Sequence, residues 1–421
     1  MSAQAPVQAG ARADEVRIGV ALSAMGFVLA GLGACVAILA RDLDEPTSRL
    51  ALLSSGFAVG LLLVAVVGPR MLRRWQMPTV LGLGSVVCAL GAVLIAVAPA
   101  YGVAIGGGLL VGLGGALLVL VAPLMLNGPA AAARLSRVNA VASGTGILAP
   151  LAIGTLDGLG PSGRLAMLAA APPLLALAIL TRPKGVRGPR HDAEPSARST
   201  GRQVADTRLD AGDRGEEPAL PVLIDSAPAV GLGRKWRRVG RRVVVDVGVG
   251  WLRVVLAVAV EFCFVVWAVA RLVAAGLPTA TAALLGSAFP IGMAVGRAIG
   301  PIRWRGWSPV FPSGLLAACG TLLVSMVDVP AVVALGLVVA GLGVAPLYPV
   351  TLAALVATPG LSSARLAAVG AMASGTAILV APALLAVLAR VVDLRTAYLV
   401  TLPLIGVLLL LSRRSDRAAF V

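Results

Sequence analysis

The chain has 421 residues, of which 58% are hydrophobic and only 13% are charged. Soluble domains average roughly 45 to 50% apolar and about 25% charged residues, so this composition excludes an ordinary soluble protein and indicates an integral membrane protein. The formal net charge is +16, but the basic residues lie in connections between apolar runs rather than on a soluble basic module, so we expect no nucleic-acid binding.

Apolar stretches of about 20 residues, long enough to cross roughly 30 Å of hydrocarbon as a helix, recur along the chain. They are rich in Ala, Gly and Leu on every face, unlike the alternating strands of a transmembrane barrel. We therefore predict an all-α integral membrane fold with about twelve transmembrane helices. The predicted helices span residues 17–40, 50–69, 77–99, 102–126, 138–155, 164–180, 250–275, 279–301, 310–326, 331–356, 365–389 and 397–411.

Arginines favour the connections on one side of the predicted membrane. The connections after the second, fourth, eighth and tenth helices carry Arg70, Arg73, Arg74, Arg134, Arg137, Arg303, Arg305 and Arg365 without an acid among them. The alternate connections hold Asp42, Asp44, Glu45, Asp157, Asp328 and Asp393 mixed with a few arginines. Because basic connections stay in the cytoplasm, we predict a multi-pass protein of the plasma (cell) membrane with both termini cytoplasmic.

A polar segment at residues 183–247 divides the predicted helices into two groups of about six. Its low hydrophobicity and high charge predict a disordered cytoplasmic linker. It separates a bundle at 17–182 from a second bundle at 248–412, and short cytoplasmic tails lie at 1–16 and 413–421.

The end of this linker is densely basic. Its charged residues are Arg234, Lys235, Arg237, Arg238, Arg241 and Arg242. A cluster of this kind suits anionic lipid headgroups at the cytoplasmic face of the bilayer. It equally suits a plain topology signal without a lipid ligand.

The two groups of helices are copies of one another. Residues 51–75 align without gaps with residues 283–307, and residues 134–148 align with 365–379. The matched pairs include Phe57 with Phe289, Gly60 with Gly292, Gly68 with Gly300, Arg73 with Arg305 and Trp75 with Trp307. Since each copy holds an even number of spans, the second copy enters the membrane in the same direction as the first, which predicts a parallel repeat.

The chain closely resembles the major facilitator superfamily. The features that carry this resemblance are two parallel repeats, a long linker after the sixth helix, and a glycine-initiated basic loop after the second and eighth helices. The family's loop usually runs Gly, any residue, Leu, Ala, Asp, Arg, any residue, Gly, Arg, Arg. This chain keeps Gly68 and Arg73 but has Leu72 in place of the Asp and Trp75 in place of the second Gly. The resemblance implies a transporter with its site between the halves, and conformational loops at Gly68, Arg73, Gly300 and Arg305.

Glu261 is the one acidic residue that falls in the interior of a predicted helix. It lies about 12 Å beyond Arg253 at 1.5 Å per residue. An ionised side chain at that depth costs at least about 2.5 kcal/mol, so we expect it to face the bundle interior or a water-filled cavity. Arg297 on the next helix is its predicted partner. The pair could bind substrate or couple transport to protons, or it could be a structural ion pair.

Other polar side chains are candidates for the cavity wall. Trp267 and Tyr348 lie near the midplane on helices that, in the family, surround the central cavity. The hydroxyl groups of Ser143, Thr145, Ser374 and Thr376 could bond a polar substrate, although such groups more often join helices.

We expect a secondary active transporter that moves a small solute by alternating access. Export of small organic compounds and uptake of a sugar-like metabolite both fit, and coupling to protons stays open. The alternative is a non-transporting membrane scaffold or sensor whose linker binds partners. We expect no enzyme, metal or cofactor: the single histidine, His191, lies in the linker, and the glycine-rich residues 106–115 lack the Lys-Ser or Lys-Thr of a nucleotide loop.

Overall fold

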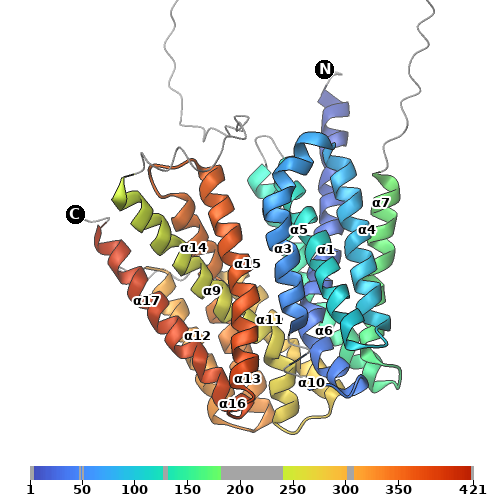
Figure 1. Cartoon of the computed structure of the whole chain (residues 1–421), viewed down its shortest axis with the longest axis vertical. Helices are drawn as coiled ribbons and strands as arrows, with labels where there is room; N and C mark the ends of the chain where they lie inside the picture. The colour runs from blue at the N-terminus through green and yellow to red at the C-terminus, as the bar shows by residue number, and fades with distance from the viewer. Residues whose placement is uncertain are drawn as a thin grey trace, which may run out of the picture. The chain divides into compact units, whose positions relative to one another are not determined.

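The computed structural model describes residues 4–46, 49, 52–126, 131–181, 240–300 and 308–418. These residues form helices joined by short connections, without a strand among them. In Figure 1 the first half runs from blue to green and the second from yellow to red. The first half contains α1 (Gln4–Asp42), α3 (Leu52–Arg74), α4 (Met77–Val97), α5 (Tyr101–Met125), α6 (Ala131–Gly158), η1 (Gly163–Ala170) and α7 (Ala171–Leu180). The second half contains α9 (Arg241–Ala274), α10 (Thr279–Gly286), α11 (Ala288–Ile299), α12 (Val310–Met326), α13 (Pro330–Val344), α14 (Leu347–Val356), α15 (Ser363–Leu388), α16 (Leu394–Ala397), η3 (Tyr398–Val400) and α17 (Thr401–Ala418).

The helices confirm the predicted all-α membrane fold. Within the described residues, ten helical segments are long and apolar enough to cross a membrane, and two shorter apolar helices, Leu52–Gly68 and Val310–Met326, coincide with the second and ninth predicted spans. Several helices extend beyond their predicted spans; for example, α1 begins at Gln4 and α9 at Arg241. Hydrophobicity marks the membrane-crossing stretch, whereas the backbone hydrogen bonds continue into polar residues.

The sixth predicted span divides into η1 and α7, and the eighth and tenth are also broken in the middle. The eighth span divides into α10 and α11 at Ser287, and the tenth divides into α13 and α14 at Ala345 and Pro346. Proline lacks the N–H that would bond the carbonyl four residues earlier. Pro290 and Pro346 therefore interrupt the hydrogen-bond ladder at these two points, and the chain changes direction there.

The repeat is visible in the packing of the helices. A methyl group at Gly112 of α5 would overlap the carbonyl oxygen of Phe57 of α3, and one at Gly341 of α13 would overlap the carbonyl oxygen of Phe289 of α11. Phe57 and Phe289 are a matched pair of the sequence repeat. Both halves thus use a glycine to bring the corresponding helices into backbone contact.

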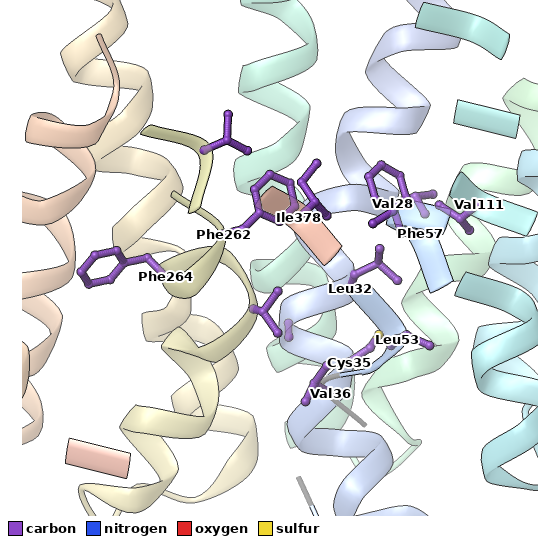
Figure 2. Close-up of a cluster of buried hydrophobic side chains, with 14 of the residues drawn as sticks. Val28, Leu32, Cys35, Val36, Leu53, Phe57, Val111, Phe262, Phe264 and Ile378 are labelled. Carbon is purple, nitrogen blue, oxygen red and sulfur yellow. The ribbon is translucent and has the colours of Figure 1, made fainter. Parts of the chain in front are cut away.

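The apolar core includes side chains from both halves. Figure 2 shows one region of it, where labelled side chains of α1, α3 and α5 lie near those of α9 and α15. The first helices of the two halves touch closely: a methyl group at Gly33 of α1 would overlap the carbonyl oxygen of Val265 of α9. Elsewhere α3 packs against α15, and α6 packs against α10.

Candidate functional site

Glu261 lies in the interior of α9, as the sequence predicted. The residues on either side of it, Val260 and Phe262, are buried, whereas 15% of the Glu261 side chain is exposed. Phe264, about one turn further along, stacks on Phe289 of α11 with 5.4 Å between the ring centroids. This stacking fixes α11 against α9 beside the carboxylate.

Arg297 lies on α11 and reaches Glu261. The distance from its Nη2 to Glu261 Oε1 is 3.6 Å, which is longer than the roughly 2.7 to 2.9 Å of a charge-assisted hydrogen bond. The predicted partnership is therefore present as an ion pair without a hydrogen bond. The Arg297 side chain is 42% exposed.

Ser143 joins this pair from the other half of the molecule. Arg297 Nη1 donates a hydrogen bond of 2.9 Å to Ser143 Oγ on α6. The Ser143 hydroxyl in turn donates to the carbonyl oxygen of Asn139 at 2.9 Å. Its proton is thus used within α6, and its lone pairs remain available to the guanidinium.

Tyr348 and Ser374 complete the group. Tyr348 follows the break at Pro346, interacts with the hydroxyl of Ser374 on α15, and lies near Glu261. Ser374 also donates to the carbonyl oxygen of Gly370 at 3.1 Å. We call Ser143, Glu261, Arg297, Tyr348 and Ser374 the polar cluster. Both halves contribute to it.

Three other predicted cavity residues bond the backbone instead. Trp267 is buried, and its indole nitrogen donates to the carbonyl oxygen of Pro382 on α15 at 3.3 Å. Thr145 donates to the carbonyl oxygen of Ser23 on α1 at 2.9 Å. Thr376 bonds its own helix. The first two contacts join helices, whereas the third lies within α15.

The predicted conformational loops differ between the halves. α3 continues through Gly68 to Arg74, and Arg73 is exposed at its end. In the second half α11 stops at Ile299, and Gly300 has a φ of 77°, a conformation that favours glycine. Arg305 lies outside the described residues. The basic residues Arg234, Lys235, Arg237 and Arg238 also lie outside them, and Arg241 and Arg242 open α9.

A cavity of about 380 Å³ lies beside the polar cluster. Its described lining comes from the end of α11, from Pro309 before α12, and from the residues around the α13–α14 break. Arg297 is the one charged residue in that described lining, and the rest are Gly, Ala, Pro and Val. The cavity therefore combines one cation with small apolar walls.

Sequence reasoning missed ion pairs at the ends of helices in both halves. Arg271 of α9 is fully buried and bonds Asp328 Oδ1 at 2.8 Å, and Arg395 bonds Asp328 Oδ2 at 2.6 Å. The hydrogen bond from Arg395, followed by that from Arg271, lowers the pKa of Asp328 below its ordinary value of 3.8. The first half holds a comparable pair, Arg41 with Asp157 at 2.7 Å. The signal was present in the sequence: Arg271 lies near the end of its predicted span, and the other charged residues of these pairs lie just beyond the ends of theirs.

The fold matches those of solved membrane transporters. The crystal structure of a mutant of the nucleoside transporter NupG has a TM-score of 0.68 and 13% identity, covering 97% of this chain and 100% of that chain. The structure of a D-xylose-proton symporter has a TM-score of 0.68 and 13% identity, with coverage of 94% and 96%. The E. coli fucose:proton symporter FucP has a TM-score of 0.56 and 15% identity, with coverage of 94% and 98%.

No protein-family model matches the sequence, and a search of curated proteins gives no match. The similarity is therefore one of structure. The described helices have the fold of these solved transporters.

Proposed function

We propose that this chain, with its major facilitator fold, is a secondary active transporter that carries a small solute between its two halves by alternating access. The bond from Arg297 to Ser143 carries the proposal, because it makes the polar cluster a joint product of both halves. Motion of one half against the other would expose such a site to one side of the membrane at a time. The similar structures include two that are titled proton symporters.

Proton coupling is proposed to occur at Glu261. A carboxylate inside a membrane span is costly unless it is paired or wet, and the Glu261 carboxylate is mostly buried and only loosely paired with Arg297. A group with this balance can exist as the carboxylate beside Arg297 or as the neutral acid. The titratable side chains that interact with it in the described structure are Arg297 and Tyr348.

Reconstitution of the full chain into liposomes tests both parts. A panel of nucleosides, sugars and organic acids is offered with a pH gradient imposed in either direction. We expect solute to accumulate down the proton gradient in the wild type. In Glu261→Gln we expect that accumulation to disappear while exchange of solute for solute persists, because the amide neither takes up nor releases a proton near neutral pH.

Glu45→Gln is the control, since Glu45 pairs with Arg49 outside the spans. Full pH dependence in Glu261→Gln would remove Glu261 from the coupling. The direction of the pH gradient that drives accumulation also distinguishes uptake from export. Folded, monodisperse protein without flux for any solute would favour the scaffold or sensor, whose linker binds partners.

The arrangement in the membrane is also a proposal. The bundles at 17–182 and 248–412 are the moving bodies, the linker at 183–247 and both termini are cytoplasmic, and the basic residues before α9 contact anionic lipid. Reporter fusions at each terminus, active on one side of the plasma membrane only, test the orientation. Sedimentation of a linker peptide with phosphatidylserine vesicles, against phosphatidylcholine vesicles, tests the lipid contact.

A further inference from the structure

We infer that the transported solute is a small organic monoanion whose acidic group binds Arg297, and that it crosses together with one proton on Glu261. This inference rests on the proposed transport function and adds the chemical class of the solute. It follows from three features of the polar cluster: the loose ion pair, the lining of the adjacent cavity, and the balance of charge.

The guanidinium of Arg297 has spare capacity. Arginine has five N–H donors in a planar fork that matches a carboxylate. Among the described residues, the hydrogen bond of this side chain goes to Ser143, and the Glu261 oxygen at 3.6 Å is too distant for a second one. An incoming carboxylate could therefore take two donors and make shorter bonds than Glu261 makes.

The adjacent cavity indicates the rest of the solute. Its volume of about 380 Å³ lies in the range of roughly 300 to 1,000 Å³ that small-molecule sites occupy. Apart from Arg297, its described walls are Gly, Ala, Pro and Val. These described wall residues offer a sugar's hydroxyl groups no side-chain partner besides Arg297, and they suit a compact apolar body that ends in one acidic group.

The charges of Glu261 and Arg297 explain why the proton accompanies the anion. The empty site is neutral when the carboxylate faces the guanidinium. With the anion on Arg297 and a proton on a Glu261 carboxyl oxygen, the site is neutral again. Either ligand alone leaves one uncompensated charge within the membrane span, which is unfavourable there. Only the empty and the doubly loaded forms are therefore suited to reorientation, and each cycle moves no net charge.

The test uses the full chain in liposomes. Short-chain and branched monocarboxylates are compared with their amides, which have nearly the same shape and no charge. We expect saturable carboxylate flux that a pH gradient drives and that a potassium-valinomycin potential leaves unchanged. The amides should give no saturable flux.

Variants place the anion on Arg297. Binding of the same carboxylates is read from the thermal stabilisation of purified protein, so that it does not depend on flux. Arg297→Gln should weaken this stabilisation at least about tenfold in concentration, because the charge-assisted bonds are lost, and Arg297→Lys should restore part of it. Arg395→Gln removes one positive charge near Asp328, away from the polar cluster, and should leave binding unchanged.

The outcomes separate the two proposals. Transport of a neutral solute with equal binding of amide and acid overturns the monoanion and leaves the transporter standing. Carboxylate flux that responds to membrane potential overturns the joint movement of one proton with one anion. Absence of both flux and binding for every solute class overturns the proposed function, and this inference with it.

Discussion

Arg297 donates a hydrogen bond of 2.9 Å to the hydroxyl group of Ser143 in the first half, and it lies 3.6 Å from its counter-charge, Glu261, in the second half. A motion of the halves would therefore break or remake the bond to Ser143, while the Glu261 pair stays within one half. Under the proposed function, Ser143 is accordingly the residue at which solute binding and the contact between halves meet.

Ser143→Ala removes the acceptor without changing the helix. We expect the apparent affinity for the solute to fall by roughly fivefold, about 1 kcal/mol for one hydrogen bond, because Arg297 loses the bond that orients it. Thr155→Val is the matched control, since Thr155 also lies on α6 and also bonds a carbonyl four residues earlier. The measurement is solute affinity by flux and by thermal shift. Equal affinities in Ser143→Ala and the wild type would contradict the role of this bond.

Asp328 lies outside the spans and forms ion pairs that acid should weaken. Its pKa is lowered by Arg395 and Arg271, so its carboxylate stabilises the fold above the ordinary value of 3.8, and that stability is lost as the pH falls through the lower folded value. Asp328→Asn should therefore lower the melting temperature at neutral pH and flatten its decline in acid. Asp393→Asn, whose side chain makes no capping bond to α16, is the control. Parallel acid profiles in Asp328→Asn and wild type would disprove the prediction.

The helices show what hydrophobicity reports and what it leaves out. The apolar windows predicted every span because the bilayer requires about 20 apolar residues whatever the packing. The same windows were silent on the breaks at Ser287 and Ala345, which depend on proline and on which neighbour donates a hydrogen bond to the freed carbonyl. In the polar cluster, Glu261 and Arg297 stood out by depth and charge. Ser143 was predicted only as one of several hydroxyls, because depth along a helix does not say which face is turned inward.

Gly300 ends α11 with a φ of 77° and a ψ of −177°, a region that is accessible almost only to glycine. Gly300→Ala should lower the free energy of unfolding by about 1 to 3 kcal/mol, because an alanine residue is strained at these backbone angles. Gly406→Ala, on α17 with open space around it, is the control and should change little. Thermal unfolding of both purified variants measures the difference. A melting temperature of Gly300→Ala equal to that of the control would refute the strain.

In the whole molecule the repeat extends to the contact between halves. α3 of the first half packs against α15 of the second, and α10 of the second half packs against α6 of the first, which are the corresponding helices exchanged. α1 and α9, the first helix of each copy, meet each other. The interface is thus nearly self-complementary, like the interface of a twofold dimer. Aligned sequences predicted two similar bundles, but they could not predict these cross-pairs, which depend on the surfaces the bundles present.

Gly33 lies where α1 meets α9. A methyl group there would overlap the carbonyl oxygen of Val265, so Gly33→Ala should force the two helices apart. We expect the free energy of unfolding to fall by about 1 to 3 kcal/mol, as overpacking commonly costs, and solute flux to fall with it. Gly19→Ala on the same helix meets nothing within 4 Å and should leave both unchanged. Wild-type flux and stability in Gly33→Ala would show that the contact is not needed.

The position of that contact along α1 has a mechanical consequence. Within the span Arg12–Asp42, Gly33 lies about 14 Å from the Asp42 end and about 32 Å from the Arg12 end, at 1.5 Å per residue. A fulcrum at Gly33 therefore gives the helix two lever arms of unequal length. A tilt of a few degrees would swing the Arg12 end more than twice as far as the Asp42 end.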